Sequence, residues 1–236
     1  MKIKVSSKKP TKEKLLKDFD GVFKRSKPFL VSRFGESTPR FIEETRREYE
    51  SIIPMIPYVG GMEPFTRYII STAQYTALNR VLQNHGKSLE EAGQFIYDLT
   101  KAFLNSYPKV FLRFLTGDIF SKKFIERVRK GAEETQKRVY PENYVLSYVE
   151  GDGVEFDYGI EYTECGVCKF LEALGALEFA PYICNVDIIS SDMYGWGLRR
   201  TMTIAEGYPT CDFRFKKGGK TSITSRILQK RARYVA

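Results

Sequence analysis

The chain has 236 residues, of which 42% are hydrophobic and 14% aromatic, and its formal net charge is +9. This composition supports a packed core and argues against wholesale disorder. No apolar run approaches the roughly 18–20 residues that a membrane span needs, and the basic N-terminus is not followed by the apolar segment of a secretory signal. We therefore expect a cytoplasmic protein with one large domain or two small ones, and no membrane partner.

The positive charge is concentrated at the two ends of the chain. Residues 1–27 hold ten Lys and Arg against three acidic residues, and residues 216–236 hold seven with no acid, so the segment between them has a net charge of −5. Charge runs at chain ends are commonly solvated or frayed. We expect a basic N-terminal extension over residues 1–37 and a basic C-terminal tail over residues 217–236, and we expect no nucleic-acid partner, although such tails could attract a polyanion.

Residues 38–140 are expected to form a helical region. Apolar residues recur at helical spacing along this stretch, prolines 54 and 57 end its first helix, and Ser88 with Glu91 forms a capping box that begins another. The expected helices cover residues 40–53, 65–85, 89–103, 109–119 and 121–139.

From residue 141 the hydrophobic period changes from 3.6 to 2. Apolar and polar residues alternate over residues 154–162, which predicts a half-buried strand, and Asp152-Gly153 predicts a hairpin turn to a partner strand over residues 144–149. A second strand pair is expected over residues 198–205 and 211–215, joined by a turn at 206–210, and helices are expected over residues 165–174 and 179–193.

These elements predict an α+β fold, in which an N-terminal helical region precedes a small four-stranded antiparallel sheet with two helices. We expect the sheet region, residues 141–216, to carry the functional site and to form one integrated domain with residues 38–140.

Arg200 is the exceptional residue of the strand expected over residues 198–205. The alternate positions of this strand are apolar except for Arg200, and a guanidinium on the core side of a strand must meet an anion. That anion is either the carboxylate of a ligand or a protein acid such as Asp187. Alternatively, the set that contains Arg199 and Thr201 is the inner face.

Four cysteines, Cys165, Cys168, Cys184 and Cys211, fall in the C-terminal half. Disulfides are improbable in a cytosolic chain, and three explanations remain. The cysteines could form a tetrahedral zinc site, one of them could be a nucleophile held as a thiolate by a nearby cation or base, or all could be small buried hydrophobes.

Two further features carry weaker signals. His85 is the only histidine and precedes Gly86, a place where histidine caps a helix C-terminus. Gly60-Gly61 precedes a helix and could present backbone amides to an anionic group, although a structural turn is the simpler explanation.

Four segments together resemble the L-2-amino-thiazoline-4-carboxylic acid hydrolase family. They are PYVGG at 57–61, YTEC at 162–165, PYICNVD at 181–187 and LRRTMTIAEGYPTCDFRF at 198–215, and the resemblance covers roughly residues 40–216. The last third also looks like a 4-vinyl-reductase-type domain, a small-molecule sensor module.

The hydrolase resemblance implies addition of water to a cyclic isothiourea, opening L-2-amino-thiazoline-4-carboxylate at a carbon–sulfur bond to N-carbamoyl-cysteine. The implied enzyme is a hydrolase acting on non-peptide C–N bonds in sulfur amino acid metabolism. Arg200 or Arg199 would hold the substrate carboxylate, Asp187 would pair with the amidine-like nitrogens and accept a proton from water, and Cys184 or Cys211 would act as nucleophile or acid. The positions that match the family are Cys165, Cys184, Asp187, Arg200, Thr201, Gly207 and Cys211.

From these residues we expect catalysis by Cys184, Asp187, Cys211 and Cys165. Substrate binding is assigned to Arg200, Arg199, Thr201, Gly60 and Gly61. No cofactor is expected; if zinc or iron were bound, its ligands would be Cys165, Cys184, Asp187 and Cys211. The expected partner is a small-molecule substrate, a homo-oligomer is possible, and the alternative function is a non-catalytic small-molecule-binding sensor module.

Overall fold

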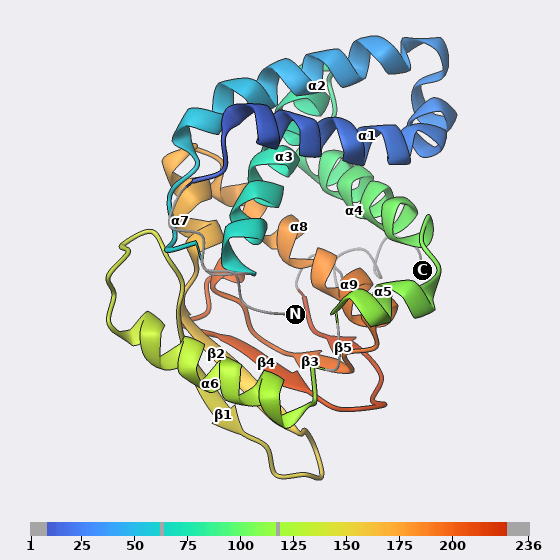
Figure 1. Cartoon of the computed structure of the whole chain (residues 1–236). Helices are drawn as coiled ribbons and strands as arrows, with labels where there is room; N and C mark the ends of the chain where they lie inside the picture. Colours follow the sequence, from blue (N-terminus) through green and yellow to red (C-terminus); the bar gives the residue numbers. More distant parts are fainter. Residues whose placement is uncertain (1–8, 62–63, 117–118, 226–236) are drawn as a thin grey trace.

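The computed structural model describes residues 9–61, 64–116 and 119–225 of the chain. Its N-terminal part is a layer of helices that packs over the rest of the molecule (Figure 1). These helices are α1 (Lys12–Phe34), α2 (Thr38–Ile52), α3 (Phe65–Asn84) and α4 (Leu89–Asn105). The capping box predicted before α4 is confirmed: Ser88 Oγ accepts from the Glu91 amide at 3.2 Å, and the Glu91 carboxylate accepts from the Ser88 amide at 2.9 Å.

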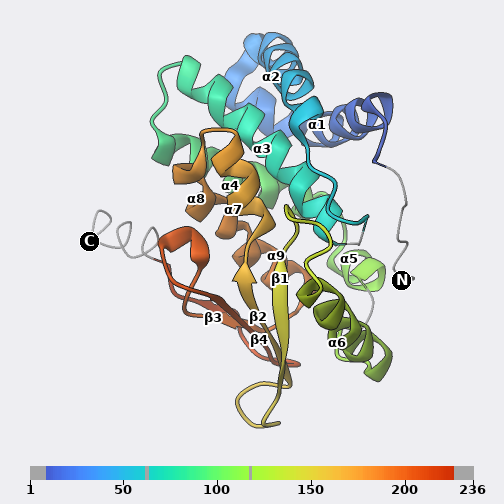
Figure 2. The same cartoon turned by 90° about the vertical axis from the view of Figure 1, so that its left-hand side faces the viewer.

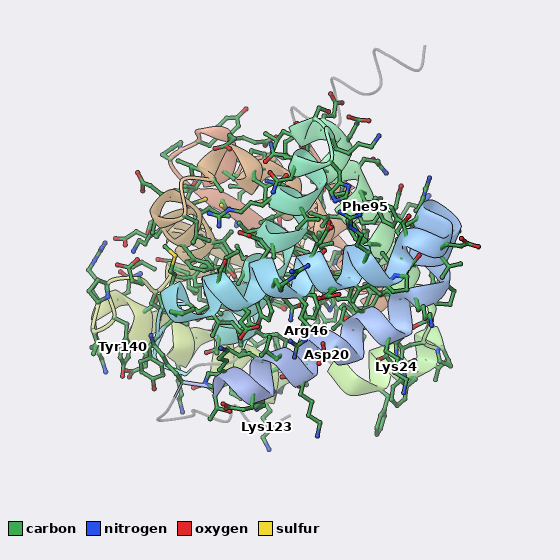
Figure 3. All side chains as sticks on the ribbon, turned by 90° about the horizontal axis from the view of Figure 1, so that it is seen from above. Asp20, Lys24, Arg46, Phe95, Lys123 and Tyr140 are labelled. Carbon is green, nitrogen blue, oxygen red and sulfur yellow. The ribbon has the colours of Figure 1, made fainter. Side chains whose placement is uncertain are left out.

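Helix α1 corrects the expectation that residues 1–37 form a solvated basic extension. Its buried face packs into the main core through Leu15, Phe19, Phe23 and Leu30. Figure 3 shows α1 beside α2, with Asp20 and Arg46 facing each other across them; Arg46 Nε donates to Asp20 at 2.9 Å. The basic residues of α1 therefore lie on the outer side of an amphipathic helix.

The middle of the chain forms two shorter helices, α5 (Lys109–Thr116) and α6 (Lys122–Gln136), close to the expected ranges. Helix α6 packs against the first strand of the sheet, β1 (Val145–Glu150), as Figure 2 shows. Two hydrogen bonds fix this contact, because Thr135 Oγ1 accepts from the Leu146 amide at 3.2 Å and Gln136 Nε2 donates to the Leu146 carbonyl at 2.8 Å.

Among the described residues the sheet has five strands, not the four that the sequence predicts. The other strands are β2 (Tyr158–Glu164), β3 (Leu198–Arg200), β4 (Cys211–Phe215) and β5 (Ser222–Ile223), in the order β1-β2-β4-β3-β5. All pairs are antiparallel except β3 with β5, which are parallel. The fifth strand comes from the segment expected to be a tail, so residues 217–225 are part of the fold; residues 226–236 lie outside the described residues.

Two strands are shorter than predicted because carboxylates take the backbone amides that would pair in the sheet. Asp152 Oδ1 accepts from the amides of Val154, Glu155 and Phe156, so β2 begins at Tyr158 instead of residue 154. Asp212 Oδ1 accepts from the amides of Thr201 and Met202, so β3 ends at Arg200. A local hydrogen bond from an aspartate competes directly with the ladder.

Helices α7 (Gly166–Ala173), α8 (Ala180–Cys184) and α9 (Val186–Tyr194) lie between the helical layer and the sheet (Figures 1 and 2). The single helix expected over residues 179–193 is therefore interrupted, at Asn185. One core cluster includes buried residues of α1–α4, β1 and α7, so the helical and sheet regions share a hydrophobic core. No helix among the described residues is both long enough and apolar enough to cross a lipid bilayer.

The burial of α1 predicts the effect of truncating Phe19. Phe19 is 0% exposed and stacks on Phe23 and Tyr49, so we expect Phe19→Ala to lower the free energy of unfolding by about 3–5 kcal/mol. Phe114→Ala is the matched control, because Phe114 is 81% exposed and its truncation should cost less than about 0.5 kcal/mol. Urea denaturation measures the change in the free energy of unfolding for both variants. Equal changes would contradict the packing of α1 into the core.

Candidate active site

The candidate site is built around the side chain of Arg200, at the end of β3. Arg200 is only 1% exposed and is the largest fully buried side chain among the described residues. Its Nη1 donates to Asp187 Oδ2 and, at 3.1 Å, to the carbonyl of Cys184, while its guanidinium lies over the Phe213 ring with 5.4 Å to the centroid. The prediction that Arg200 lies on the core side and meets an anion is confirmed, and Asp187 is that anion.

The break between α8 and α9 places both partners of Arg200. Helix α8 ends at Cys184, which leaves the Cys184 carbonyl free of the helix ladder, and α9 begins at Val186, which puts Asp187 in its first turn. A carboxylate in the first turn of a helix is also favoured by the helix dipole. The interruption that the sequence did not predict is thus what turns a carbonyl and a carboxylate toward the same guanidinium.

Three of the four cysteines converge on this ion pair. Cys165 lies where β2 passes into α7, Cys184 ends α8, and Cys211 begins β4. The Cys211 thiol accepts from the Ile204 amide at 3.1 Å. Electrostatic interactions link Cys184 to Cys165, Cys211, Asp187 and Arg200, so residues far apart in the sequence form one cluster. Cys168 is buried in α7 and hydrogen-bonds to Cys165.

Three tyrosines belong to the same cluster and were missed by the sequence analysis. Tyr162 lies opposite Cys211 in the β2–β4 ladder, and the Tyr144 and Tyr68 rings continue outward from it, with centroid distances of 5.9 Å (Tyr162–Tyr144) and 6.4 Å (Tyr144–Tyr68). Tyr68 is 41% exposed, whereas Tyr144 is 5% exposed. The alternation of β2 had placed Tyr162 on the inner face, but nothing in that pattern distinguishes a site tyrosine from a core one.

Four residues of the cluster, Cys165, Cys184, Asp187 and Tyr162, are half-buried and so keep surface that water can reach. We call this partly exposed part of the cluster the recess. Burial is the largest cause of the raised pKa values of Cys184, Asp187 and Tyr162. A group bound at the recess would therefore be partly desolvated.

The electrostatics of the recess keep its thiols and hydroxyls protonated. Burial raises the pKa of the Cys184 thiol well above its ordinary value, against the lowering effect of Arg200, and burial raises the pKa of Cys211 to about 12. A hydrogen bond between the Cys165 and Cys168 side chains, together with burial, raises the pKa of Cys165. Since the thiolate is the reactive form, attack by any of these cysteines would first need a base to remove its proton.

Asp187 is the group in the recess suited to proton transfer. Its side chain keeps 33% exposure, and burial raises its pKa above the ordinary value of 3.8 although Arg200 favours the charged form. A carboxylate with a raised pKa beside a fixed cation is a stronger base than an ordinary aspartate and is held in one orientation.

Several expected site residues lie elsewhere. Arg199 points to the opposite, exposed face of the sheet and pairs with Glu155, and the Thr201 hydroxyl donates to Asp212 at 2.6 Å, so neither forms part of the cluster. Gly60 and Gly61 both have positive φ, and a Cβ on Gly60 would lie 2.7 Å from the Tyr140 ring; their contacts are those of a turn.

Two other residues that the sequence analysis named, Gly207 and His85, lie in a turn and at a helix end. Gly207 occupies an exposed left-handed turn after Ile204–Glu206. His85 ends α3 and its Nε2 lies 2.6 Å from Glu44 on α2, which agrees with a capping role.

The described residues include no group of three or more His, Cys, Asp or Glu side chains that could hold a metal ion. Cys165, Cys184, Asp187 and Cys211, which were the alternative ligand set, are therefore not arranged as one. The same holds for the four cysteines taken as a zinc site.

Comparison with known proteins places these residues in a family. The model of the L-2-amino-thiazoline-4-carboxylic acid hydrolase family matches residues 66–215, which is more than half of the chain. The chain belongs to this family. No curated protein and no solved structure matches this chain.

The segment that matches the hydrolase family contains the whole recess. Arg200, Asp187 and the three recess cysteines all lie within residues 66–215, as do Tyr68, Tyr144 and Tyr162. Helices α1 and α2 and strand β5 lie outside the matched segment. The recess is thus made by the part of the chain that defines the family.

The buried ion pair predicts a large difference between two adjacent arginines. Arg200→Met would leave Asp187 without its counter-ion, and we expect a loss of about 3 kcal/mol in the free energy of unfolding. Arg199→Met removes an exposed ion pair and should cost less than about 1 kcal/mol. Chemical denaturation of both variants measures this difference, and similar values would show that Arg200 is not held as the structure has it.

The raised pKa of Cys211 predicts a slowly reacting thiol. A rise from 9.0 to about 12 lowers the thiolate fraction at pH 8 about 1000-fold, so iodoacetamide should alkylate Cys211 of the native protein far more slowly than Cys211 of the protein in guanidinium chloride. Mass spectrometry of quenched digests follows each cysteine separately. Rapid native alkylation of Cys211 would show instead that this thiol is ionised.

Proposed function

We propose that the protein hydrolyses a small carboxylate-bearing cyclic isothiourea or amide, as in the ring opening of L-2-amino-thiazoline-4-carboxylate to N-carbamoyl-cysteine. The observation that carries the proposal is the ion pair between buried Arg200 and half-buried Asp187, within the segment that matches the hydrolase family. The reaction would belong to sulfur amino acid metabolism, because its product is a cysteine derivative.

Water is the nucleophile best supported by the electrostatics of the recess. Burial raises the pKa values of the thiols and so favours their protonated form, whereas the Arg200 guanidinium favours the charged form of Asp187 against the effect of burial. In the proposed reaction Asp187 accepts a proton from water as its oxygen bonds to the ring carbon between the two nitrogens and sulfur. The second proton of the water passes from the added hydroxyl to the ring nitrogen, the carbon–sulfur bond breaks as the carbonyl forms, and sulfur takes up the proton held by Asp187, which leaves a carbamoyl group and a thiol.

Arg200 is suited to act on the substrate through Asp187. Its guanidinium is 1% exposed and its Nη1 donates to Asp187 and to the Cys184 carbonyl, whereas the Asp187 side chain keeps 33% exposure. The exposed member of the pair therefore meets the substrate, and the buried cation holds that carboxylate in place and favours its charged form.

The partial burial of the recess strengthens these interactions. Charges and hydrogen bonds act more strongly when water is excluded, and burial raises the pKa values of Cys184 and Tyr162. The helical layer contributes Tyr68 to the exposed side of the recess.

Replacement of Asp187 tests its role as the base. We expect Asp187→Asn to lower kcat/KM for L-2-amino-thiazoline-4-carboxylate by about 100-fold or more. Asp192→Asn is the matched control, because Asp192 is an exposed aspartate on the same helix and its replacement should leave the rate unchanged. Colorimetric detection of the released thiol follows the reaction.

The pH dependence of the activity is a second test of Asp187 as the base. A base must be ionised to act, so activity should fall as the pH drops through the pKa of Asp187, and this acid limb should lie above pH 3.8 because burial raises that pKa. The limb should be absent in Asp187→Asn. Saturable binding of the thiazoline by the wild type without product would instead favour the non-catalytic binding module.

A further inference from the structure

The residues that follow β4 lie beside the Arg200–Asp187 pair. Strand β5 is at the edge of the sheet next to α9 (Figure 1) and pairs in parallel with β3, with Ile223 opposite Arg200. The Thr224 amide donates to the Arg200 carbonyl at 2.9 Å. Residues 221–225 lie outside the segment that matches the hydrolase family, so the part of the chain that defines the family does not include these contacts.

Strand β5 holds the Arg200 end of β3 in the sheet. The ladder between β3 and β4 ends at Arg199, so the ladder partner of Arg200 is Ile223 of β5. Beyond Arg200, the Asp212 carboxylate takes the next two backbone amides. Because ladder hydrogen bonds fix the place of a residue in a sheet, the main chain of Arg200 is positioned from the side of β5.

A buried pair of hydroxyls joins the same segment to α9. Ser191 is 0% exposed, and its Oγ lies 2.7 Å from Thr221 Oγ1, so that one hydroxyl donates to the other. Ser191 Oγ also accepts from the Leu198 amide at 3.0 Å, two residues before Arg200. One serine side chain thus connects α9, the start of β3 and the residue before β5.

Ser191 and Asp187 share one face of α9. They are four residues apart in the helix, which places one side chain above the other. Asp187 pairs with Arg200 and Ser191 binds the Leu198 amide, so this face of α9 meets β3 at two points one helical turn apart. Two contacts fix the rotation of α9 against the strand, whereas the ion pair alone would let the helix turn about it.

The turn between α9 and β3 is also anchored at Ser191. The Ser191 carbonyl accepts from the Gly195 amide at 2.8 Å and from the Trp196 amide at 3.0 Å, and Gly195 has a left-handed backbone. These bonds close the C-terminus of the helix. With both its carbonyl and its hydroxyl bonded, Ser191 sets the direction in which the chain passes from α9 into β3.

We propose that Ser191 and Thr221 are positioning residues for the proposed reaction. Their hydroxyl pair holds α9 against β3 and β5, and thereby sets the place of the Asp187 carboxylate beside the Arg200 guanidinium. This inference rests on the proposed function, in which Asp187 is the base. A base is efficient only when its oxygen is held within hydrogen-bond reach of the proton that it removes, so a looser α9 lowers the rate although every reacting group is present.

Thr221→Val tests the proposal, because it removes the hydroxyl and keeps the branched side chain. We expect kcat for L-2-amino-thiazoline-4-carboxylate to fall about 10-fold with KM changed less than about 3-fold. Thr221→Ser keeps a hydroxyl and should restore most of the rate. Thr45→Val is the matched control: Thr45 is 0% exposed and its hydroxyl donates to the Phe41 carbonyl within α2 at 2.8 Å, so kcat should be unchanged.

Ser191→Ala removes the same hydroxyl pair from the other side, together with the acceptor of the Leu198 amide. Its kcat should fall at least as far as that of Thr221→Val, and the double variant should be no slower than Ser191→Ala alone, because the two hydroxyls act through one bond. Ser26→Ala is the control, a serine of α1 that is 3% exposed. Losses that multiply in the double variant, or a Thr221→Val as active as the wild type, would overturn the positioning role and leave the proposed function standing.

The pH profile is a readout that a general loss of stability would not move. The Arg200 guanidinium lowers the pKa of Asp187 against the effect of burial, so a weaker ion pair should raise that pKa and move the acid limb of kcat/KM to higher pH in Thr221→Val and Ser191→Ala. In both controls the limb should match that of the wild type. A limb that is unchanged or moves to lower pH in the Thr221 and Ser191 variants would contradict the proposal.

Carbon-13 NMR of the Asp187 carboxyl separates the two proposals if the wild type shows no turnover. With aspartate labelled at Cγ and the signal assigned through Asp187→Asn, the pKa is measured without a substrate. A higher pKa in Thr221→Val and Ser191→Ala than in the wild type would support the positioning of Asp187 by the hydroxyl pair, although hydrolysis is overturned. Equal or lower values in the two variants would overturn the positioning role as well.

Discussion

The burial of one guanidinium is the constraint on which the site depends. A cation as enclosed as Arg200 is stable only beside an anion and further acceptors, and the chain supplies these from Asp187 and the Cys184 carbonyl. To bring them there, the helix expected over residues 179–193 must break and β3 must end at Arg200. The ion pair thereby ties α8, α9 and the sheet into one unit.

The same enclosure gives the recess its chemical character. Burial favours the neutral form of each thiol and tyrosine hydroxyl, so the recess presents donors that do not ionise around a single carboxylate whose pKa is also raised. An arrangement of this kind suits the addition of water to a small anionic molecule better than attack by a cysteine. If water is the nucleophile, as proposed, the cysteines contribute to the polarity and shape of the recess and do not attack the substrate.

The sequence predicted much of the fold from local signals. The capping box at Ser88, the helices from residue 38 to residue 139 and the pairing of residues 144–149 with the following strand all depend on residues close in the chain. It failed for α1, where ten basic residues among the first 27 concealed an apolar face of Leu15, Phe19, Phe23 and Leu30. The net charge summed over the first 27 residues does not show at which positions the apolar residues recur. That helical spacing is what identifies an amphipathic helix.

For the site, the sequence by itself determined that Arg199 and Arg200 lie on opposite faces of their strand, because alternation fixes which side chains share a face, and that the one on the core side needs an anion. It also singled out Asp187 and the cysteines. Only the tertiary structure decided that Arg199 and Thr201 face away, that Gly60 and Gly61 form a turn, and that Tyr68, Tyr144 and Tyr162 complete the recess. The reason is physical: strand and helix periods specify directions within an element, whereas the approach of elements distant in the chain depends on how all of their faces pack together.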